Sequence, residues 1–127
     1  MKTINRNHLD ALRIIQSHIY EANHKAGWWT NLETGEFLDR NKGEMIALMH
    51  SELSECLEAV RKNQMDDHLP NRKGEEVELA DTIIRILDYA GGFNLDVVGA
   101  LAEKFEYNQK RADHKIANRK KDGGKKI

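Results

Sequence analysis

Two segments of this 127-residue chain carry pairs of carboxylates at a spacing that can place both on one face of a helix. Glu52 and Glu55 are three residues apart, as are Glu78 and Asp81. Residues at this spacing on a helix lie about 5–6 Å apart between Cβ atoms. Two such helices packed side by side would bring four like charges together, which repel unless a cation lies among them. Because all the ligand atoms would be oxygens, the pattern favours Mg²⁺ or Mn²⁺ over zinc.

Metal ions held by carboxylates on facing helices serve two common kinds of chemistry. A di-iron carboxylate bundle needs Glu-x-x-His motifs, and no histidine follows a candidate glutamate at that spacing. The second kind is polyphosphate chemistry, in which Mg²⁺ binds a few carboxylates, waters and phosphate oxygens. Ions bound in this way can activate a water and stabilise a leaving pyrophosphate. The spacing therefore favours a polyphosphate substrate.

Such a substrate also needs positive charges. Lys104 and Arg111 can supply them, because charged donors form strong hydrogen bonds to phosphate. Together with Asn108 they recur at i, i+4 and i+7, which predicts one shared face of a helix. No acidic residue is spaced to pair with them on that face, so the face is either solvated or directed at an anion.

Periodic apolar residues predict four helices that would position these side chains, with capping residues at their starts. The expected bounds are Asn5 or Asn7 to about Ala22, Asp39 or Asn41 to about Lys62, Gly74 to Ala90, and Asn94 or Asp96 to about Lys115. Gly91 and Gly92 are expected to end the third helix. On that helix Asp81, Arg85 and Asp88 continue a polar stripe that begins at Glu78. The pattern therefore predicts an all-α fold, a bundle of four or five helices.

Composition is typical of a single helical domain. Charged residues make up 32% of the chain and hydrophobic residues 39%, with a net charge of −1. This charge does not indicate a specific nucleic acid or a membrane as partner. A single cysteine, Cys56, excludes a disulfide framework and fits a cytoplasmic location. No apolar run approaches the roughly 18–20 residues of a membrane span, and no signal peptide is visible.

The segment between the first two predicted helices contains two adjacent tryptophans, Trp28 and Trp29. Glycine and asparagine residues mark it as irregular, with a short hairpin as one possibility. Both indoles cannot easily face the same core. One is expected to pack on the bundle and the other to cover a nucleobase, although a hydrophobic lid or a subunit contact would explain them as well. His18 on the first helix is a further candidate contact, with a structural role as the alternative.

The order of the three motifs resembles the MazG-like all-α nucleoside triphosphate pyrophosphohydrolases. That family has ExxE, a linker, ExxD and then KxxxNxxR, matched here by Glu52-x-x-Glu55, Glu78-x-x-Asp81 and the Lys104 to Arg111 segment. The match covers residues 39–111 and is closest to the compact single-domain type of bacteria and phages. The resemblance implies Mg²⁺-dependent hydrolysis of a nucleoside triphosphate between its α and β phosphates, which gives a monophosphate and pyrophosphate.

The resemblance also assigns roles to individual residues. Glu52, Glu55, Glu78 and Asp81 would hold the Mg²⁺, with Mn²⁺ as a substitute, and Glu55 would also orient or deprotonate the attacking water. Lys104, Asn108 and Arg111 would bind phosphate or sugar. Trp28, Trp29 and His18 lie where such enzymes recognise the base. The active site of such enzymes is completed by a second subunit, which implies a homodimer or homotetramer.

Apolar residues around much of the predicted second helix independently favour oligomerisation, because a chain of this length has little core to cover them. Residues 1–115 are expected to form the helical domain, and residues 116–127 a basic, flexible tail. The tail could contact phosphates weakly, or it could serve only for solubility. The functional alternative is a helical interaction protein that binds a partner or a nucleotide without turnover.

Overall fold

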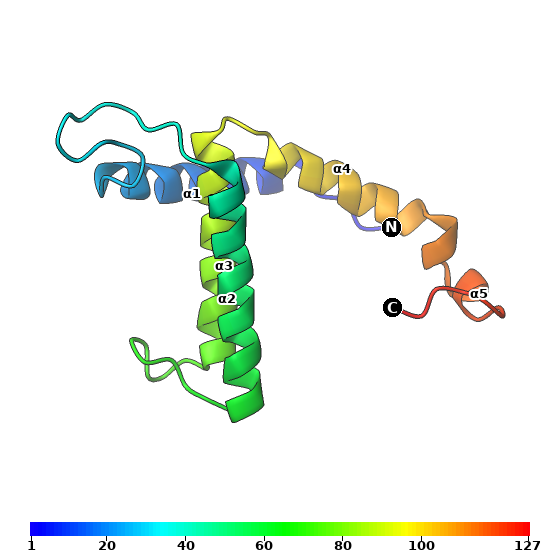
Figure 1. Ribbon diagram of the computed structural model, residues 1–127. Coiled ribbons are helices and arrows are strands. Elements are labelled where there is room, and N and C mark those ends of the chain that lie inside the picture. Colours follow the sequence, from blue (N-terminus) through cyan, green and yellow to red (C-terminus); the bar gives the residue numbers. More distant parts are fainter. The chain divides into compact units, whose positions relative to one another are not determined.

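The computed structural model describes all residues from Met1 to Ile127 and contains helices but no strand, which confirms the predicted all-α class (Figure 1). The helices are α1 (Arg6–Lys25), α2 (Lys42–Lys62), α3 (Gly74–Gly92), α4 (Val97–Lys110), the short 3-10 helix η1 (Ala112–His114) and α5 (Ile116–Arg119). Residues 16–95 form one compact unit, and residues 1–15 with 96–127 form the other. None of the helices is long and apolar enough to cross a membrane.

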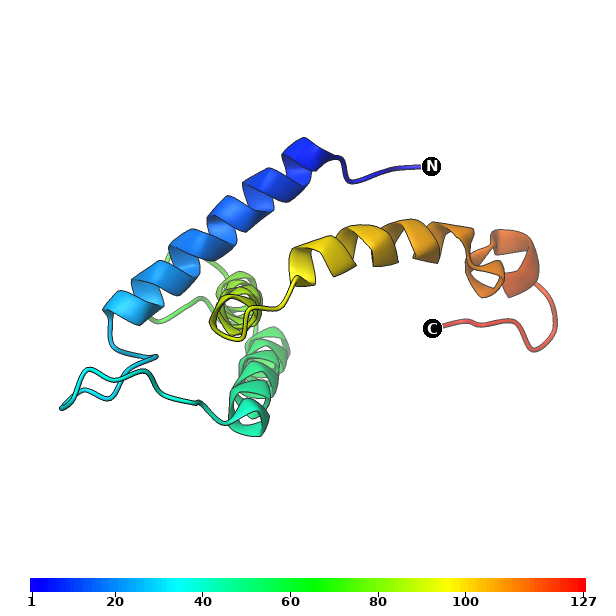
Figure 2. The same cartoon turned by 90° about the horizontal axis from the view of Figure 1, so that it is seen from above.

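Within the first unit, α2 and α3 pack side by side as an antiparallel hairpin (Figure 1 and Figure 2). Asn41 caps α2 as predicted, because its side chain accepts a hydrogen bond of 2.9 Å from the backbone N–H of Glu44. At the closed end of the hairpin Gly74 allows close approach, since a Cβ there would lie 2.9 Å from the Cβ of Ala59. This close packing brings the polar side chains of the two helices together.

The prediction that Gly91 and Gly92 end the third helix is wrong. Helix α3 continues through both glycines, and Phe93 is its C-cap. The reason is tertiary packing, since a Cβ on Gly91 would lie 2.8 Å from the Cβ of Tyr20, and one on Gly92 would lie 2.0 Å from the ring of Trp29. The glycines therefore serve to admit two aromatic rings against the helix.

Trp29 is the centre of this packing and is completely buried. Its indole N–H donates a hydrogen bond of 2.9 Å to the buried carboxylate of Asp88. Phe37 stacks on the ring with centroids 6.0 Å apart, and Tyr20 and Phe93 meet it edge-on. The segment after Trp29 turns back through an isolated bridge between Thr30 and Phe37, so the hairpin considered from the sequence exists only as this bridge.

In the second unit Asp96 caps α4, as one of the two predicted alternatives, and accepts a hydrogen bond of 3.0 Å from the N–H of Gly99. The helix ends five residues earlier than the predicted Lys115. Arg111 follows it with extended backbone angles (φ −62°, ψ 133°), and η1 and α5 come next. Helix α5 lies inside the segment expected to be flexible, and its flexibility stays a prediction.

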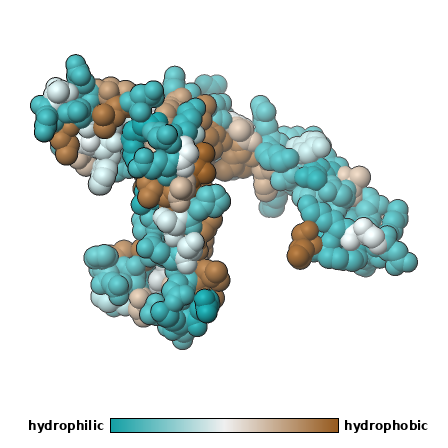
Figure 3. Space-filling view, in the orientation of Figure 1, coloured by the Kyte–Doolittle hydropathy of each residue, from teal (hydrophilic) through white to brown (hydrophobic).

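Large apolar side chains are exposed along α2 and α3. They include Leu57 at 60% exposed and Ile83 at 57% exposed. Figure 3 shows apolar surface along the edge of this hairpin. Isolated exposed leucines need no explanation, but a row of them on two adjacent helices is typical of surfaces that contact another protein.

Candidate metal centre and adjoining cleft

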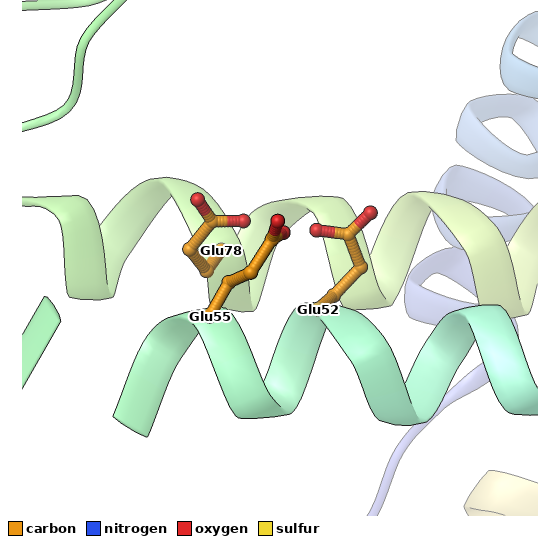
Figure 4. A group of neighbouring side chains, drawn as sticks. All are labelled: Glu52, Glu55 and Glu78. Atoms are coloured by element: carbon orange, nitrogen blue, oxygen red, sulfur yellow. The ribbon is translucent and has the colours of Figure 1, made fainter. Parts of the chain in front are cut away.

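Three of the four predicted metal ligands come together between α2 and α3. One carboxylate oxygen each from Glu52, Glu55 and Glu78 lies within 4.8 Å of the others. Figure 4 shows the first two rising from α2 and the third from α3, with their carboxylates directed to one region. Glu52 is buried, Glu78 is half-buried and Glu55 is exposed, so the group has access to solvent from one side. These three residues are called the acidic cluster below.

Burial and the closeness of the three carboxyl groups raise the pKa values of Glu78 and Glu55. Burial raises the pKa of Glu78 to about 7, with further contributions from hydrogen bonding to Glu52 and from the charges of Glu55, Glu52 and Asp81. Hydrogen bonding to Glu52 is the main cause of the raised pKa of Glu55, followed by burial. Near neutral pH the cluster therefore keeps a proton on Glu78 in part of the molecules, which relieves some of the repulsion.

Glu52 behaves differently because it has a cationic partner. Arg85 of α3 donates a hydrogen bond of 2.8 Å from its Nε to Oε1 of Glu52. Burial of Glu52 acts to raise its pKa, but the hydrogen bonds from Arg85, Glu78 and Glu55 outweigh that effect and the pKa is lowered. Arg85 thus forms an ion pair with one member of the cluster, and the other two members have no ion pair.

Asp81, the fourth predicted ligand, does not join this 4.8 Å group. Its side chain lines the neighbouring cleft, together with that of Glu52. Burial is the main cause of its raised pKa, followed by the charge of Glu52. Asp81 is thus near enough to Glu52 to interact with it electrostatically without sharing the cluster.

The neighbouring cleft has a volume of about 470 Å³ and combines acidic, basic and aromatic side chains. Its walls come from Asn23, Trp28, Arg40, Leu48, Glu52, Asp81, Ile84, Arg85 and Asp88. A smaller hollow of about 190 Å³ opens on the other side of the acidic cluster, where Asp66 and Asp67 join Glu55 and Glu78. The cluster therefore lies between two solvent-accessible depressions.

Sequence reasoning missed Arg85 and Arg40 as residues of this region. Arg85 belongs to the polar stripe on α3 that contains Glu78 and Asp81, so its spacing was a usable signal for its position beside the carboxylates. No local pattern marks Arg40, whose guanidinium lies 5.5 Å from the centre of the Trp29 ring. Its place in the cleft depends on the tertiary packing of Trp29.

One of the two tryptophans packs in the core, as one of the sequence interpretations expected, and the other is exposed. Trp29 is in the core, so it cannot stack on a nucleobase while the fold is intact, and its assignment as a base contact is wrong. Trp28 is 63% exposed and lines the cleft. His18 is exposed on α1 and is not among the residues that line the cleft.

The three predicted phosphate contacts belong to the second unit. Arg111 has left the helix, and its Nε and Nη2 donate hydrogen bonds of 2.9 and 2.7 Å to the two carboxylate oxygens of Asp113. The expectation that no acidic partner is available is therefore wrong for Arg111, because the break after α4 brings Asp113 within reach. Lys104 Nζ lies 4.7 Å from the centre of the Tyr107 ring. Asn108 has a buried Oδ1 with no hydrogen-bond partner, so it keeps an unused acceptor.

Comparisons of the chain with protein-family models, with curated proteins and with solved structures found no match. The site must therefore be interpreted from its own residues, and the class it defines is a helical hairpin with an acidic cluster beside a mixed-charge cleft.

Proposed function

We propose that this protein is a divalent-metal-dependent nucleoside triphosphate pyrophosphohydrolase, which cleaves the bond between the α and β phosphates. The observation that carries the proposal is the acidic cluster, in which three carboxylates from two helices converge within 4.8 Å. Like charges at this distance destabilise each other without a cation. The oxygen-only donor set fits Mg²⁺ or Mn²⁺, and the motif order supports the resemblance to the MazG-like family.

In this proposal Glu52, Glu55 and Glu78 hold the metal, and Asp81 contributes from the cleft side, directly or through water. The bound ion supplies Lewis-acid stabilisation of phosphate oxygens and a more acidic water. Glu55 is the exposed member of the cluster, so it is the residue best placed to accept a proton from an attacking water.

The cleft supplies contacts for the rest of the substrate. Its volume of about 470 Å³ lies in the range of small-molecule sites. Trp28 presents an exposed indole on which a flat base can stack. Arg40 and Arg85 offer guanidinium groups suited to phosphate oxygens. We propose Lys104, Asn108 and Arg111 as further phosphate or sugar contacts, in an active site completed by a second subunit of a homodimer or homotetramer.

A second candidate function is a helical interaction module without turnover. It is favoured by the large apolar side chains exposed along α2 and α3, among which Leu57 and Ile83 are more than half exposed. It is also compatible with the Glu52–Arg85 ion pair, since a cluster neutralised by arginine can be purely structural. In that case the repulsion between Glu55 and Glu78 is relieved only by the proton that Glu78 keeps in part of the molecules near neutral pH.

The two functions are separated by incubating the protein with a panel of nucleoside triphosphates and Mg²⁺ and by measuring release of pyrophosphate. The enzyme should release pyrophosphate from at least one nucleotide, stop on addition of EDTA, and lose activity by orders of magnitude in Glu55→Gln. Glu21→Gln is the matched control, because it removes the same charge from an exposed position on α1. Silence with every nucleotide, with Mg²⁺ and with Mn²⁺, would reject the enzyme.

A further inference from the structure

The net charge of −1 conceals a strong asymmetry along the chain. Residues 110–127 contain eight Lys or Arg residues and two Asp residues, a net charge of +6. Residues 1–109 contain twelve basic and nineteen acidic residues, a net charge of −7. Blocks of like charge of this density commonly bind a partner of opposite charge. The acidic remainder of the chain would oppose that binding, so the basic segment has to carry it.

The chain of the basic segment returns on itself, because two of its glycines permit a turn. Gly123 has a φ of +75°, and a Cβ on Gly124 would lie 2.5 Å from the backbone oxygen of Asn118. After the turn, Arg119 donates hydrogen bonds of 3.1 and 2.9 Å to the backbone oxygens of Lys125 and Lys126. The turn therefore holds the lysines that precede Gly123 and those that follow Gly124 close together.

Not all of the positive charges in the segment are free. Lys110 pairs with Glu106, Arg111 pairs with Asp113, and the side chains of Arg119 and Lys126 bind backbone oxygens. The remaining four side chains form no ion pair or hydrogen bond and are all exposed. They are Lys115, Lys120, Lys121 and Lys125. These four lysines are called the free lysines below.

We propose that the segment of residues 110–127 is a sequence-independent nucleic-acid-binding surface, in which the free lysines contact backbone phosphates. The segment contains no Phe, Tyr or Trp on which bases could stack, so unpaired bases offer it little. It therefore fits the phosphates of a duplex, which have the higher charge density. A membrane surface fits less well, because α5 has only four residues and the segment offers only two large apolar side chains, Ile116 and Ile127.

The number of free lysines sets the expected salt dependence. Each phosphate neutralised on duplex DNA contributes about −0.9 to the slope of log K against log salt concentration, so four contacts give about −3 to −4. A fourfold rise in salt should then weaken binding about 100-fold. This is a weak interaction of the non-specific kind, with a dissociation constant of about 10⁻⁴–10⁻⁶ M at physiological salt.

The test is fluorescence anisotropy of a labelled 20-base-pair duplex with the full-length protein, from about 50 to 200 mM salt. Substitution of all four free lysines by Gln should weaken binding at least tenfold and bring the slope close to zero, whereas their substitution by Arg should preserve both. A control variant changes four exposed lysines outside the segment to Gln, namely Lys2, Lys25, Lys62 and Lys73. It alters the net charge equally and should change affinity by about twofold or less.

Three results would overturn this inference. They are an absence of binding at the lowest salt, an equal loss of affinity in the control variant, and tighter binding to phosphatidylserine vesicles than to the duplex with the same dependence on the free lysines. None of these measurements depends on nucleotide turnover, so their outcome does not depend on whether the protein is a pyrophosphohydrolase.

Discussion

Ionisation of Glu78 should destabilise the folded protein as the pH rises from about 4.5 to about 7. An ordinary glutamate titrates near 4.5, whereas burial and the neighbouring acidic groups raise the pKa of Glu78 to about 7. Below pH 4.5 this carboxyl is protonated in both the folded and the unfolded chain. As the pH rises, the unfolded chain loses the proton first, so the stability contributed by the raised pKa is lost as the pH passes through about 7.

The size of this loss follows from the two pKa values. The difference between 4.5 and about 7 corresponds to about 3 kcal/mol as an upper limit. Because Glu78 is only half-buried, solvent screening reduces the expected loss to about 1–2 kcal/mol. Glu78→Gln removes the ionisable group and keeps its shape. In EDTA the variant should be more stable than the wild type by about 1–2 kcal/mol near pH 8 and nearly equal to it near pH 5.

The measurement is urea denaturation followed by far-ultraviolet circular dichroism at both pH values. Glu21→Gln, at an exposed position on α1, should change the free energy of unfolding by less than about 0.5 kcal/mol at either pH. Saturating Mg²⁺ should reverse the order of wild type and Glu78→Gln near pH 8, because a ligand at about 100 times its dissociation constant adds about 2.7 kcal/mol. Equal destabilisation of Glu78→Gln at both pH values would refute the reasoning, since the side chain would then act through packing.

Three further predictions test the surroundings of the site. Arg85→Gln should lower the free energy of unfolding by about 1.5–3 kcal/mol near pH 7, because Glu52 is left buried without its cation. This loss of stability should be smaller near pH 4, where Glu52 can be protonated. Gly92→Ala should destabilise by more than about 1 kcal/mol in the same urea assay, because its Cβ would lie 2.0 Å from the Trp29 ring. Light scattering at micromolar concentration should show a homodimer or larger, and a stable monomer would contradict this.

The helix starts could be predicted because capping is local. Asn41 and Asp96 each accept a hydrogen bond from a backbone N–H three residues later, and nothing distant is required. The end of α3 could not be predicted in the same way. Gly91 and Gly92 have the composition of a helix stop, but their role depends on the rings of Tyr20 and Trp29, which are far away in the sequence.

The candidate site was also predicted where the signal is local and missed where it depends on tertiary structure. Helical periodicity is a local property, and it placed Glu52 and Glu55 correctly on one face of α2, with Glu78 opposite them on α3. The same spacing also predicted Asp81 as a member of the group, and Asp81 lies outside it. The helix that carries Lys104 and Asn108 ends before Arg111, and the backbone break provides Asp113 as a partner. Neither glycine nor proline marks that break, so apolar periodicity extended the helix too far.

The acidic cluster is difficult to explain as a device for stability alone. Ion pairs buried between helices can often be replaced by apolar residues without loss, and here Arg85 compensates only Glu52. A divalent cation would provide the missing positive charge, and it would have to displace the proton that Glu78 retains near neutral pH. Calorimetric titration with Mg²⁺ near pH 6.5, in two buffers of different ionisation enthalpy, should therefore detect proton release by the wild type. Release should disappear in Glu78→Gln and decline near pH 8.5, where Glu78 is already ionised. Mg²⁺ binding without proton release near pH 6.5 would place the ion away from Glu78.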